Sequence, residues 1–381
     1  MLLLIYIINQ ICQEEKPSLP LCRPVSSDKT YESGYVAIIH NVGKISNRKA
    51  GITMTHLKWG ILSTGTIAKK FADTLSRLPD CGILSAVASR NQESAAQFAA
   101  AYNIPQAYGD YLSLVRNPDI DVIYIATPHS LHYANVRLCL ENNKHVLCEK
   151  SFTVNLVQAT ALTQLAKEKN LFLMEAFWTK FLPAYQLLDK AIAQGEIGDI
   201  THFRAQYGFA PTGARYVRKF DPNLAGGALL DIGVYALGVA AMLLGYEPTG
   251  MCAKAIIGEY NTDKFDSIML SFKNGVTAHL ITTIGTVIEQ QAIIFGTKGQ
   301  ITLPNFSALQ SFTVEKSDGT QYTVDSPFEI NGFEYQIRET AACLLAKQTE
   351  SSIMTHQNTL AIMRLMDEAR AAWGLRFPCE D

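Results

Sequence analysis

From residue 57 onward, short apolar runs alternate with amphipathic segments of about 10–15 residues. This alternation is typical of βαβ units, in which parallel strands form one sheet with helices on both faces. The pattern predicts strands over residues 57–62, 83–88, 122–126, 145–148 and 172–174. It predicts helices over residues 66–78, 92–102, 132–142 and 156–169. The first part of the chain is therefore expected to form a doubly wound parallel sheet.

The pattern changes at about residue 200, where longer strands with alternating apolar and polar positions begin. The expected strands span residues 200–207, 251–260, 267–272, 277–283, 290–295 and 313–316. Turn sequences such as Lys273-Asn274-Gly275 between them favour antiparallel pairing. Two helices, over 332–347 and 357–373, are expected at the end of the chain. The fold class is thus α/β, with a dinucleotide-binding type of domain over 54–176 and an α+β domain with an open, mainly antiparallel sheet over 177–381.

Residues 1–53 share neither pattern. The apolar run at residues 1–12 has no basic residue before it and no small-residue cleavage site after it, so it is a poor export signal. The remaining residues up to the first strand are polar and aperiodic, as in disordered segments. Because Met54 stands just before the first strand, we expect 1–53 to be an upstream mis-start of the reading frame or a disordered extension. A membrane-tethering or export segment is the remaining alternative.

Charge and composition restrict the class of function. Lys and Arg number 33 against 35 Asp and Glu, which leaves a net charge of −2 and argues against the basic face of a nucleic-acid binder. The same balance argues against a polybasic membrane-surface protein, and no run of about 18 apolar residues is expected to span a membrane. The eight cysteines form no C-x-x-C pair and no zinc-ligand spacing, so no metal site is expected. We expect a cytoplasmic protein that acts on a small molecule.

The first strand is followed by a turn with a partial dinucleotide-binding pattern. In the G-x-G-x-x-G/A pattern, Ser63 takes the first glycine position, Gly65 the second and Ala68 the third. The second position matters most, because only a residue without a side chain lets the backbone approach a pyrophosphate at a helix N-terminus. The residues expected to hold the cofactor here are Ser63, Thr64, Gly65, Thr66 and Ile67. A plain tight turn is the alternative.

The end of the second strand indicates the type of cofactor. A carboxylate at this point would bind the ribose 2′-hydroxyl of NAD, but the chain reads Ser89-Arg90. A hydroxyl and a guanidinium suit the 2′-phosphate of NADP. We therefore expect NADP, with NAD as the alternative and Arg90 as a solvated loop residue in that case.

Five ordered segments resemble the Gfo/Idh/MocA oxidoreductases: residues 59–65, 126–132, 144–150, 174–181 and 225–235. The last two are similar to the branch that contains dimeric dihydrodiol dehydrogenases and NADP-dependent D-xylose dehydrogenases. The resemblance covers residues 57 to 378. It implies an NADP-dependent dehydrogenase that moves hydride between nicotinamide and a carbinol carbon of a cyclic polyol, a trans-1,2-dihydrodiol or an aldopyranose such as D-xylose. It also implies a homodimer formed through the exposed face of the second sheet.

The resemblance implies three catalytic residues: Lys150, Asp231 and Tyr235. Asp231 and Tyr235 are four residues apart and would share one face of a helix. Lys150 follows the fourth parallel strand, at the sheet edge where open α/β sheets bind ligands. We expect Tyr235 to act as acid and base, with Lys150 lowering its pKa and Asp231 orienting the substrate or the lysine. A core tyrosine and a surface lysine are the structural alternatives.

Further residues complete the expected site. Thr127, Pro128, His129 and Glu149 are expected to line the cofactor cleft with Lys150. Trp178 and Phe181 are expected to form an aromatic wall for the substrate, with a place in the hydrophobic core as the alternative.

One position departs from the family pattern. Ser151 replaces the proline that follows the lysine and is usually cis in the family. Serine either keeps the cis bond or takes the trans form and shifts Lys150. The change keeps open a second function, that of a non-catalytic nucleotide-binding sensor or regulator of the same fold.

Overall fold

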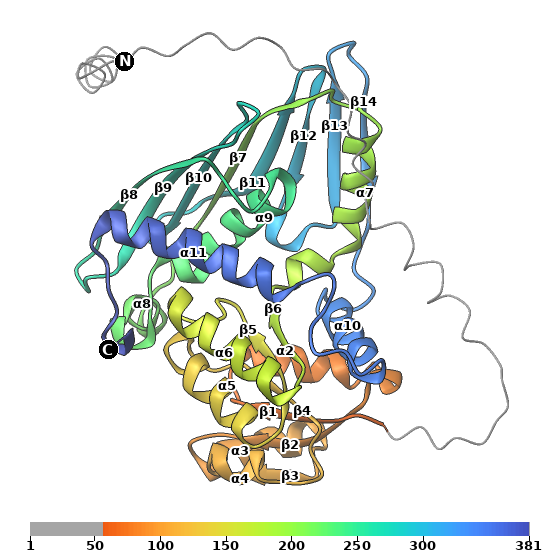
Figure 1. Cartoon of the computed structure of the whole chain (residues 1–381), viewed down its shortest axis with the longest axis vertical. Helices are drawn as coiled ribbons and strands as arrows, with labels where there is room; N and C mark the ends of the chain where they lie inside the picture. Colours follow the sequence, from red (N-terminus) through yellow and green to blue (C-terminus); the bar gives the residue numbers. More distant parts are fainter. Residues whose placement is uncertain (1–55, 381) are drawn as a thin grey trace, which may run out of the picture. The chain divides into compact units, whose positions relative to one another are not determined.

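The computed structural model of the protein describes residues 56–380. The expectations for residues 1–53 fall outside the described residues. Two β-sheets, each with its own helices, organise the described part of the chain (Figure 1).

The first sheet has six parallel strands in the order β3-β2-β1-β4-β5-β6. The strands are β1 (Lys58–Leu62), β2 (Ile83–Ala88), β3 (Gln106–Tyr108), β4 (Val122–Ile125), β5 (His145–Glu149) and β6 (Leu173–Ala176). The strand order reverses between β1 and β4, which places the switch point of the sheet at the ends of these strands. The predicted parallel sheet is confirmed, and β3 is an addition because three residues are too short for a periodic signal.

Helices flank this sheet: α2 (Thr66–Leu75), α3 (Gln92–Tyr102), α4 (Tyr111–Val115), α5 (His132–Glu141) and α6 (Leu156–Lys169). The bounds of α3 and α6 agree with the sequence prediction. Each begins after an asparagine whose side chain accepts a backbone N–H of the first turn, and each ends at an asparagine with a φ of 53°. Asparagine favours both positions, so the helix ends were readable from the sequence.

The second sheet has eight strands in the order β14-β13-β12-β11-β7-β10-β9-β8. They are β7 (Ile200–Phe209), β8 (Gly250–Ile257), β9 (Asp263–Ser271), β10 (Thr277–Ile284), β11 (Ile288–Gly296), β12 (Gly299–Pro304), β13 (Ser311–Lys316) and β14 (Gln321–Asp325). All pairs are antiparallel except β7 with β10. The mainly antiparallel sheet is confirmed, and β12 and β14 were not predicted.

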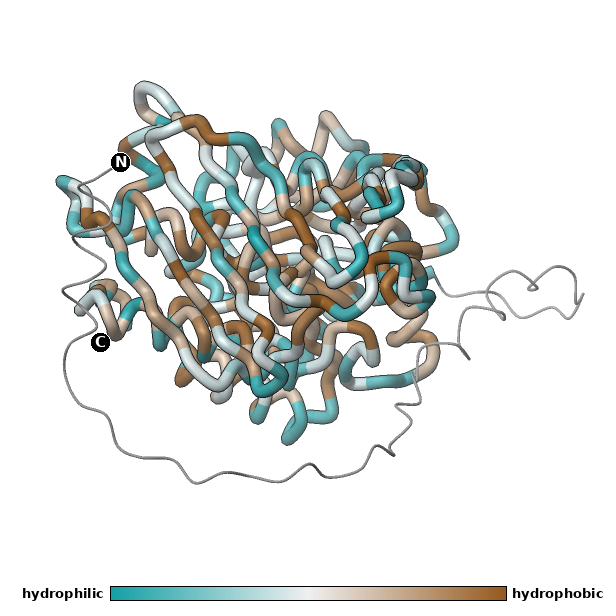
Figure 2. The backbone as a smooth tube through the Cα atoms, turned by 90° about the horizontal axis from the view of Figure 1, so that it is seen from above, coloured by the Kyte–Doolittle hydropathy of each residue, from teal (hydrophilic) through white to brown (hydrophobic). Residues whose placement is uncertain are grey.

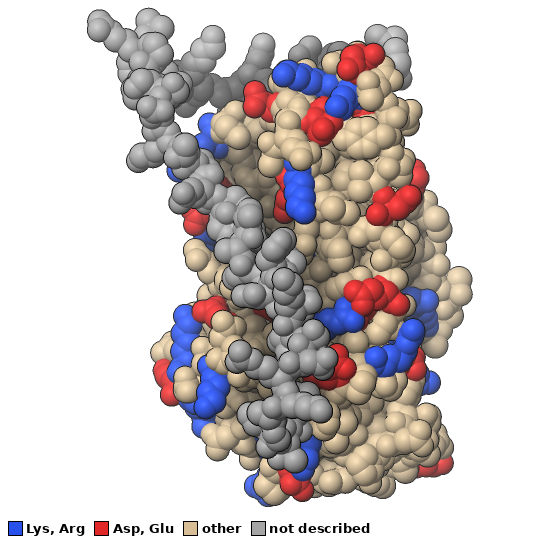
Figure 3. Space-filling view, turned by 90° about the vertical axis from the view of Figure 1, so that its right-hand side faces the viewer, with Lys and Arg blue, Asp and Glu red and all other residues tan. Residues whose placement is uncertain are grey.

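Three helices cover one face of this sheet: α7 (Pro183–Ala193), α9 (Val234–Leu244) and α11 (His356–Trp373) (Figure 1). Hydrophobic and hydrophilic residues follow one another along the strands (Figure 2), as expected for a sheet with one covered face. On the opposite face Ile256 and Met269 keep 60% and 51% of their surface exposed. Acidic and basic side chains are interspersed on the side of the molecule drawn in Figure 3.

The last long helix, α11, links the two sheets. It packs on α6, which flanks the first sheet, and on β8 of the second sheet. Its Thr359 hydroxyl donates to the Glu175 carboxylate of β6 at 2.9 Å, and Asp367 accepts the Leu156 N–H of α6 at 2.8 Å. The N-terminal sheet is therefore held in part by residues from the end of the chain.

One apolar segment is longer than the sequence analysis expected. Pro222–Leu244 is long and apolar enough to cross a membrane by those two criteria alone, although it contains Asp231. In the structure 72% of its most apolar window is buried inside the protein, and α9 packs on β7 and β10. This burial is typical of the core helix of a globular domain.

Candidate active site

A cleft of about 960 Å³ opens at the carboxyl ends of β1, β4 and β5. Eight of the residues expected to bind the cofactor line it: Gly65, Thr66, Ile67, Thr127, Pro128, His129, Glu149 and Lys150. Asp231 and Tyr235 line the same cleft from the second domain, and so does Trp178. The structure thus brings together residues separated by up to 170 positions in the sequence.

The turn after β1 has the geometry of an anion site. Ser63 takes a φ of 112°, a conformation that favours glycine, and its hydroxyl accepts the Gly65 N–H at 3.2 Å. A side chain built on Gly65 would meet nothing closer than that hydroxyl, so the approach to the backbone is open. The ten-residue helix α2 begins here without a side-chain cap, which leaves its first N–H groups for a ligand. Ser63 and Thr64 flank the cleft without lining it.

Ser89 and Arg90 lie beyond the cleft at the end of β2. The Ser89 N–H bonds the Tyr108 carbonyl of β3 at 3.0 Å, which fixes the start of the loop. Arg90 is exposed, so its guanidinium is accessible to a ligand. The turn and this loop together fit a dinucleotide with its pyrophosphate at α2 and its ribose near Arg90.

Lys150 is held by the segment that carries Asp231. Its ammonium donates to the Asp231 carbonyl at 2.6 Å and lies 3.7 Å from the carboxylate of the same residue. The other carboxylate oxygen of Asp231 bonds the Lys219 ammonium at 2.5 Å. Burial alone would raise the pKa of Asp231, but the two ammonium groups hold it at about 2. Asp231 is therefore an ionised anchor for two lysines.

The position that departs from the family pattern keeps the local geometry. The Lys150–Ser151 peptide bond is cis. Ser151 is fully buried, and its hydroxyl donates to the Leu230 carbonyl at 2.8 Å. Of the two alternatives stated from the sequence, the structure has the cis form.

Tyr235 differs electrostatically from the sequence expectation. Its hydroxyl accepts the Trp178 indole N–H at 3.0 Å, and the Lys150 ammonium lies 4.9 Å from the centre of its ring. Burial, followed by the nearby Glu149 carboxylate, raises the pKa of Tyr235 well above its usual value. The expectation that Lys150 lowers this pKa is wrong for this structure, because Lys150 faces the ring and is bound by Asp231. Tyr235 is a neutral phenol here, and its oxygen already receives one hydrogen bond.

Glu149 lies beneath the cleft in a buried polar contact. The Tyr124 hydroxyl donates to its carboxylate at 2.5 Å. Burial raises the pKa of Glu149 to about 7, although Tyr124 and Lys150 oppose the shift. Next to it, burial lowers the pKa of the Lys70 ammonium to about 8. A carboxyl and an ammonium that both titrate near neutrality are typical of functional sites.

His129 faces the cleft as a neutral imidazole. Its Nδ1–H donates to the Ala225 carbonyl at 3.3 Å. Burial, with Lys150 nearby, lowers the pKa of His129 to about 3. His132 is fully buried between the carbonyls of Thr127 and Ser151, at 2.8 and 2.9 Å, and ties the loops after β4 and β5 together.

Two family models match this chain. The first, described as the oxidoreductase family with an NAD-binding Rossmann fold, matches residues 57–177. The second, the GFO/IDH/MocA C-terminal domain, matches residues 185–302. The chain belongs to the Gfo/Idh/MocA oxidoreductase family.

Similar proteins of known activity support the same family assignment. The trans-1,2-dihydrobenzene-1,2-diol dehydrogenase of Xenopus laevis is 38% identical over 330 residues, which cover 84% of this chain and 99% of that protein. The human protein of the same name is 33% identical over 330 residues and is 98% covered. A solved 3-ketoreductase, KijD10 from Actinomadura kijaniata in complex with NADP and TDP-benzene, is 25% identical with a TM-score of 0.76, and the match covers 83% of this chain and 98% of that one.

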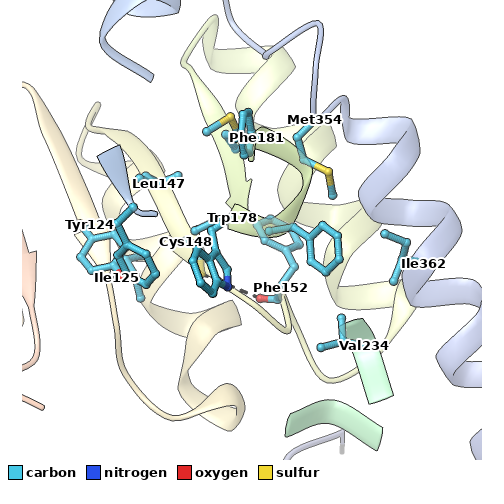
Figure 4. Close-up of a cluster of buried hydrophobic side chains, with 14 of the residues drawn as sticks. Tyr124, Ile125, Leu147, Cys148, Phe152, Trp178, Phe181, Val234, Met354 and Ile362 are labelled. Atoms are coloured by element: carbon cyan, nitrogen blue, oxygen red, sulfur yellow. Dashed lines mark hydrogen bonds between the residues drawn. The ribbon is translucent and has the colours of Figure 1, made fainter. Parts of the chain in front are cut away.

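One residue that was expected to line the cleft of this Gfo/Idh/MocA member lies in the hydrophobic core instead. Trp178 lines the cleft, but Phe181 is 5% exposed and belongs to the hydrophobic core, so the expected aromatic wall of these two is wrong. Figure 4 draws both side chains in one buried cluster. Phe333, just before α10 (Glu334–Leu345), lines the cleft together with Trp178. The core alternative given for Phe181 is the one the structure has.

Sequence reasoning missed several cations of this Gfo/Idh/MocA cleft. Lys219 comes from α8 (Ala214–Phe220), in a segment with no clear periodicity. Lys70 comes from α2, and its ammonium lies 4.2 Å and 4.1 Å from the ring centres of Trp178 and Phe333. The only sequence signal that could have marked Lys70 as a cleft residue is its position early in the helix that follows Gly65. With these residues, lysine and arginine outnumber carboxylates along the cleft, which suits a phosphate-bearing cofactor.

Proposed function

We propose that the protein is an NADP-dependent dehydrogenase of cyclic polyols, with trans-1,2-dihydrodiols as the first substrate class and aldopyranoses as the second. The observation that carries the proposal is the Tyr235 hydroxyl. It accepts the Trp178 N–H, so its own proton is free for a substrate oxygen in the cleft. The dihydrodiol dehydrogenases among the relatives support the substrate class.

The chain's own groups divide the work of the reaction. When bound, the nicotinamide supplies or takes up the hydride. Tyr235 donates its proton to the oxygen of the reacting carbon in the reduction and takes it back in the oxidation. The ammonium of Lys150, held by Asp231, stabilises negative charge that develops on that oxygen. Both side chains are half-buried in the cleft, so their polar ends can reach a bound substrate.

A substrate panel tests the proposal. Purified protein is offered NADP with dihydrodiols, pentoses and hexoses, and the reduced nicotinamide is followed by its absorbance. We expect turnover with at least one cyclic polyol and loss of that turnover in Tyr235→Phe. Cofactor binding without turnover on any member of the panel would favour the sensor function instead.

The cofactor preference rests on Arg90. Arg90→Ala is expected to raise the Kd for NADP by about 10- to 100-fold, the loss of one charge-assisted hydrogen bond, and to leave NAD nearly unchanged. Titration of both cofactors by protein fluorescence measures the effect. Arg77→Ala, at another exposed arginine that does not line the cleft, is the matched control. An equal loss for NAD and NADP would mean that Arg90 does not read the 2′-phosphate.

The assembly is proposed to be a homodimer through the open face of the second sheet, in the cytoplasm. Support comes from Ile256 and Met269, which are exposed on that face beside Cys252. Light scattering at micromolar concentration is expected to give the dimer mass, and Met269→Glu to give the monomer. Ile83→Glu changes an equally apolar exposed residue away from this face and should keep the dimer. A monomeric wild type would overturn the proposal.

A further inference from the structure

Two aspartates of β9 point to the same side of the sheet because of a bulge. Asp266 is buried and Ser267 is not, as expected for alternating residues. Asp263 would face the other way, but the pairing with β8 shifts: Ile257 pairs with Asp263 and Ile256 with Phe265, which leaves Lys264 without a partner residue. Both carboxyls therefore lie on the buried face, each with 1% of its surface exposed.

The two buried carboxyls are close enough for the charge of Asp263 to raise the pKa of Asp266, and each accepts a hydrogen bond from a different neighbour. Asp263 Oδ2 accepts the Leu229 N–H at 2.6 Å, and Asp266 Oδ2 accepts the Thr282 hydroxyl at 3.0 Å. The Oδ1 atoms of both are buried, and no donor among the described residues reaches them. Ionising two adjacent buried carboxyls together is costly, and one shared proton would give both Oδ1 atoms a partner.

Asp263 holds the segment that carries the catalytic groups. Leu229 stands at the start of a helix that runs on through Asp231 and Tyr235, so the carboxylate meets the positive end of the helix. Gly227, two residues before Leu229, packs closely against the Asp263 carboxyl. A Cβ atom at Gly227 would lie 2.2 Å from Asp263 Oδ1. The Gly227 N–H also bonds the Lys219 carbonyl at 2.8 Å. The Asp263 carboxylate thus fixes where the helix that starts at Leu229 lies relative to α8.

We propose that Asp263 and Asp266 share one proton and act together as positioning residues for Asp231 and Tyr235. The inference rests on the proposed function for the role of those two residues, while the shared proton stands on the geometry of β9. Asp266 carries the proton and donates it to Asp263, which keeps its charge for the helix N-terminus. Burial and the neighbouring Asp263 raise the pKa of Asp266 well above its usual value, in agreement with this assignment.

Other ionisable groups on the elements around the pair are directed elsewhere. On η6 (Leu229–Gly233), Asp231 is bound by Lys150 and Lys219. On β9 itself, the Lys264 side chain turns toward Gly285 and the Tyr216 ring. The remaining groups are His279 of β10, which contacts Ser267, the exposed Lys254 and Cys252 of β8, and Glu259 and Tyr260 of the turn before β9. The charge that bears most on Asp266 is that of Asp263.

Asp266→Asn tests the shared proton without any substrate. The folded wild type keeps a proton that the unfolded carboxyl releases above its ordinary pKa of about 4, so its stability falls as pH rises toward the raised folded pKa. Asparagine donates the same hydrogen bond and does not titrate. The difference in Tm between Asp266→Asn and wild type is therefore expected to grow from pH 5 to pH 8. Parallel Tm curves would overturn the shared proton.

Asp266→Leu tests the positioning role with a side chain that branches at the same atom but has no donor. At pH 7 we expect Asp266→Asn to keep kcat within about twofold, and Asp266→Leu to lose about 10- to 100-fold, as small misplacements of catalytic groups do. Asp189→Asn is the control: Asp189 is an exposed aspartate of α7, away from the cleft, and kcat should not change. A wild-type kcat in Asp266→Leu would overturn the positioning role. Should Asp266→Leu fail to fold, Asp263→Ala, which removes the acceptor for Leu229, must lower kcat in the same way.

Discussion

Replacement of Tyr235 by phenylalanine is expected to lower kcat by about 10²–10⁴-fold, the usual contribution of a general acid or base. The ring keeps its packing 5.8 Å from Phe177, so only the hydroxyl and the acceptor of the Trp178 N–H are lost. The Kd for NADP should stay within a few-fold. Steady-state kinetics with the best substrate of the panel and a cofactor titration measure the two effects.

Tyr207→Phe is the matched control, because Tyr207 lines the same cleft and burial also raises its pKa. It should keep kcat.

The raised pKa of Tyr235 also predicts a pH dependence with a definite sign. Below a pKa that exceeds the ordinary value of about 10, the phenol holds its proton, so the reduction rate should stay level up to about pH 9 while the oxidation rate keeps rising. Full activity in Tyr235→Phe would make His129 or a water relay the next candidate for proton transfer.

Lys150→Met is expected to lose at least as much kcat as Tyr235→Phe. Methionine fills a similar length but brings no charge to the reacting oxygen, and Asp231 loses one of its two cations. Because lysine and tyrosine act on the same oxygen, the double variant should be little worse than either single one.

The structure supplies a close control for this prediction. Lys219→Met removes the other cation of Asp231, at 2.5 Å, from the side of α8. If Lys150 acts on the reacting atoms, Lys219→Met should cost much less kcat than Lys150→Met. Equal losses in the two variants would mean that Lys150 serves only to neutralise Asp231.

The sequence predicted what local patterns specify. The asparagines at 91, 103, 155 and 170 define helix ends in any context, and the turn at Gly65 needs no distant partner. Short or irregular elements such as β3 and α8 went unpredicted, because neither has enough residues for a period to appear. The proposed catalytic residues Lys150, Asp231 and Tyr235 came from motifs, and the structure brings them to one cleft.

Side-chain environment was harder to predict than position. The pKa of Tyr235 is raised by burial and by the Glu149 carboxylate, and neither can be read from a motif. Lys150 is bound by the Asp231 carbonyl, a backbone group that no motif specifies. Phe181 stands three residues after Trp178, yet its burial is set by the packing of distant elements. Asp263 and Asp266 share the buried face because of a bulge at Lys264, and a bulge is defined by the register with the neighbouring strand β8.

The contact of α11 with α6 and β6 has a consequence for how the protein is made. Synthesis proceeds at about 5–20 residues per second, so the six-stranded sheet leaves the ribosome on the order of ten seconds before the helix that covers α6. During that interval the Leu156 N–H and the Glu175 carboxyl lack the partners that Asp367 and Thr359 later provide. The nucleotide-binding half therefore reaches its final state only after the last helix has docked, and a ribosome that stalls before residue 356 releases a chain with that surface uncovered.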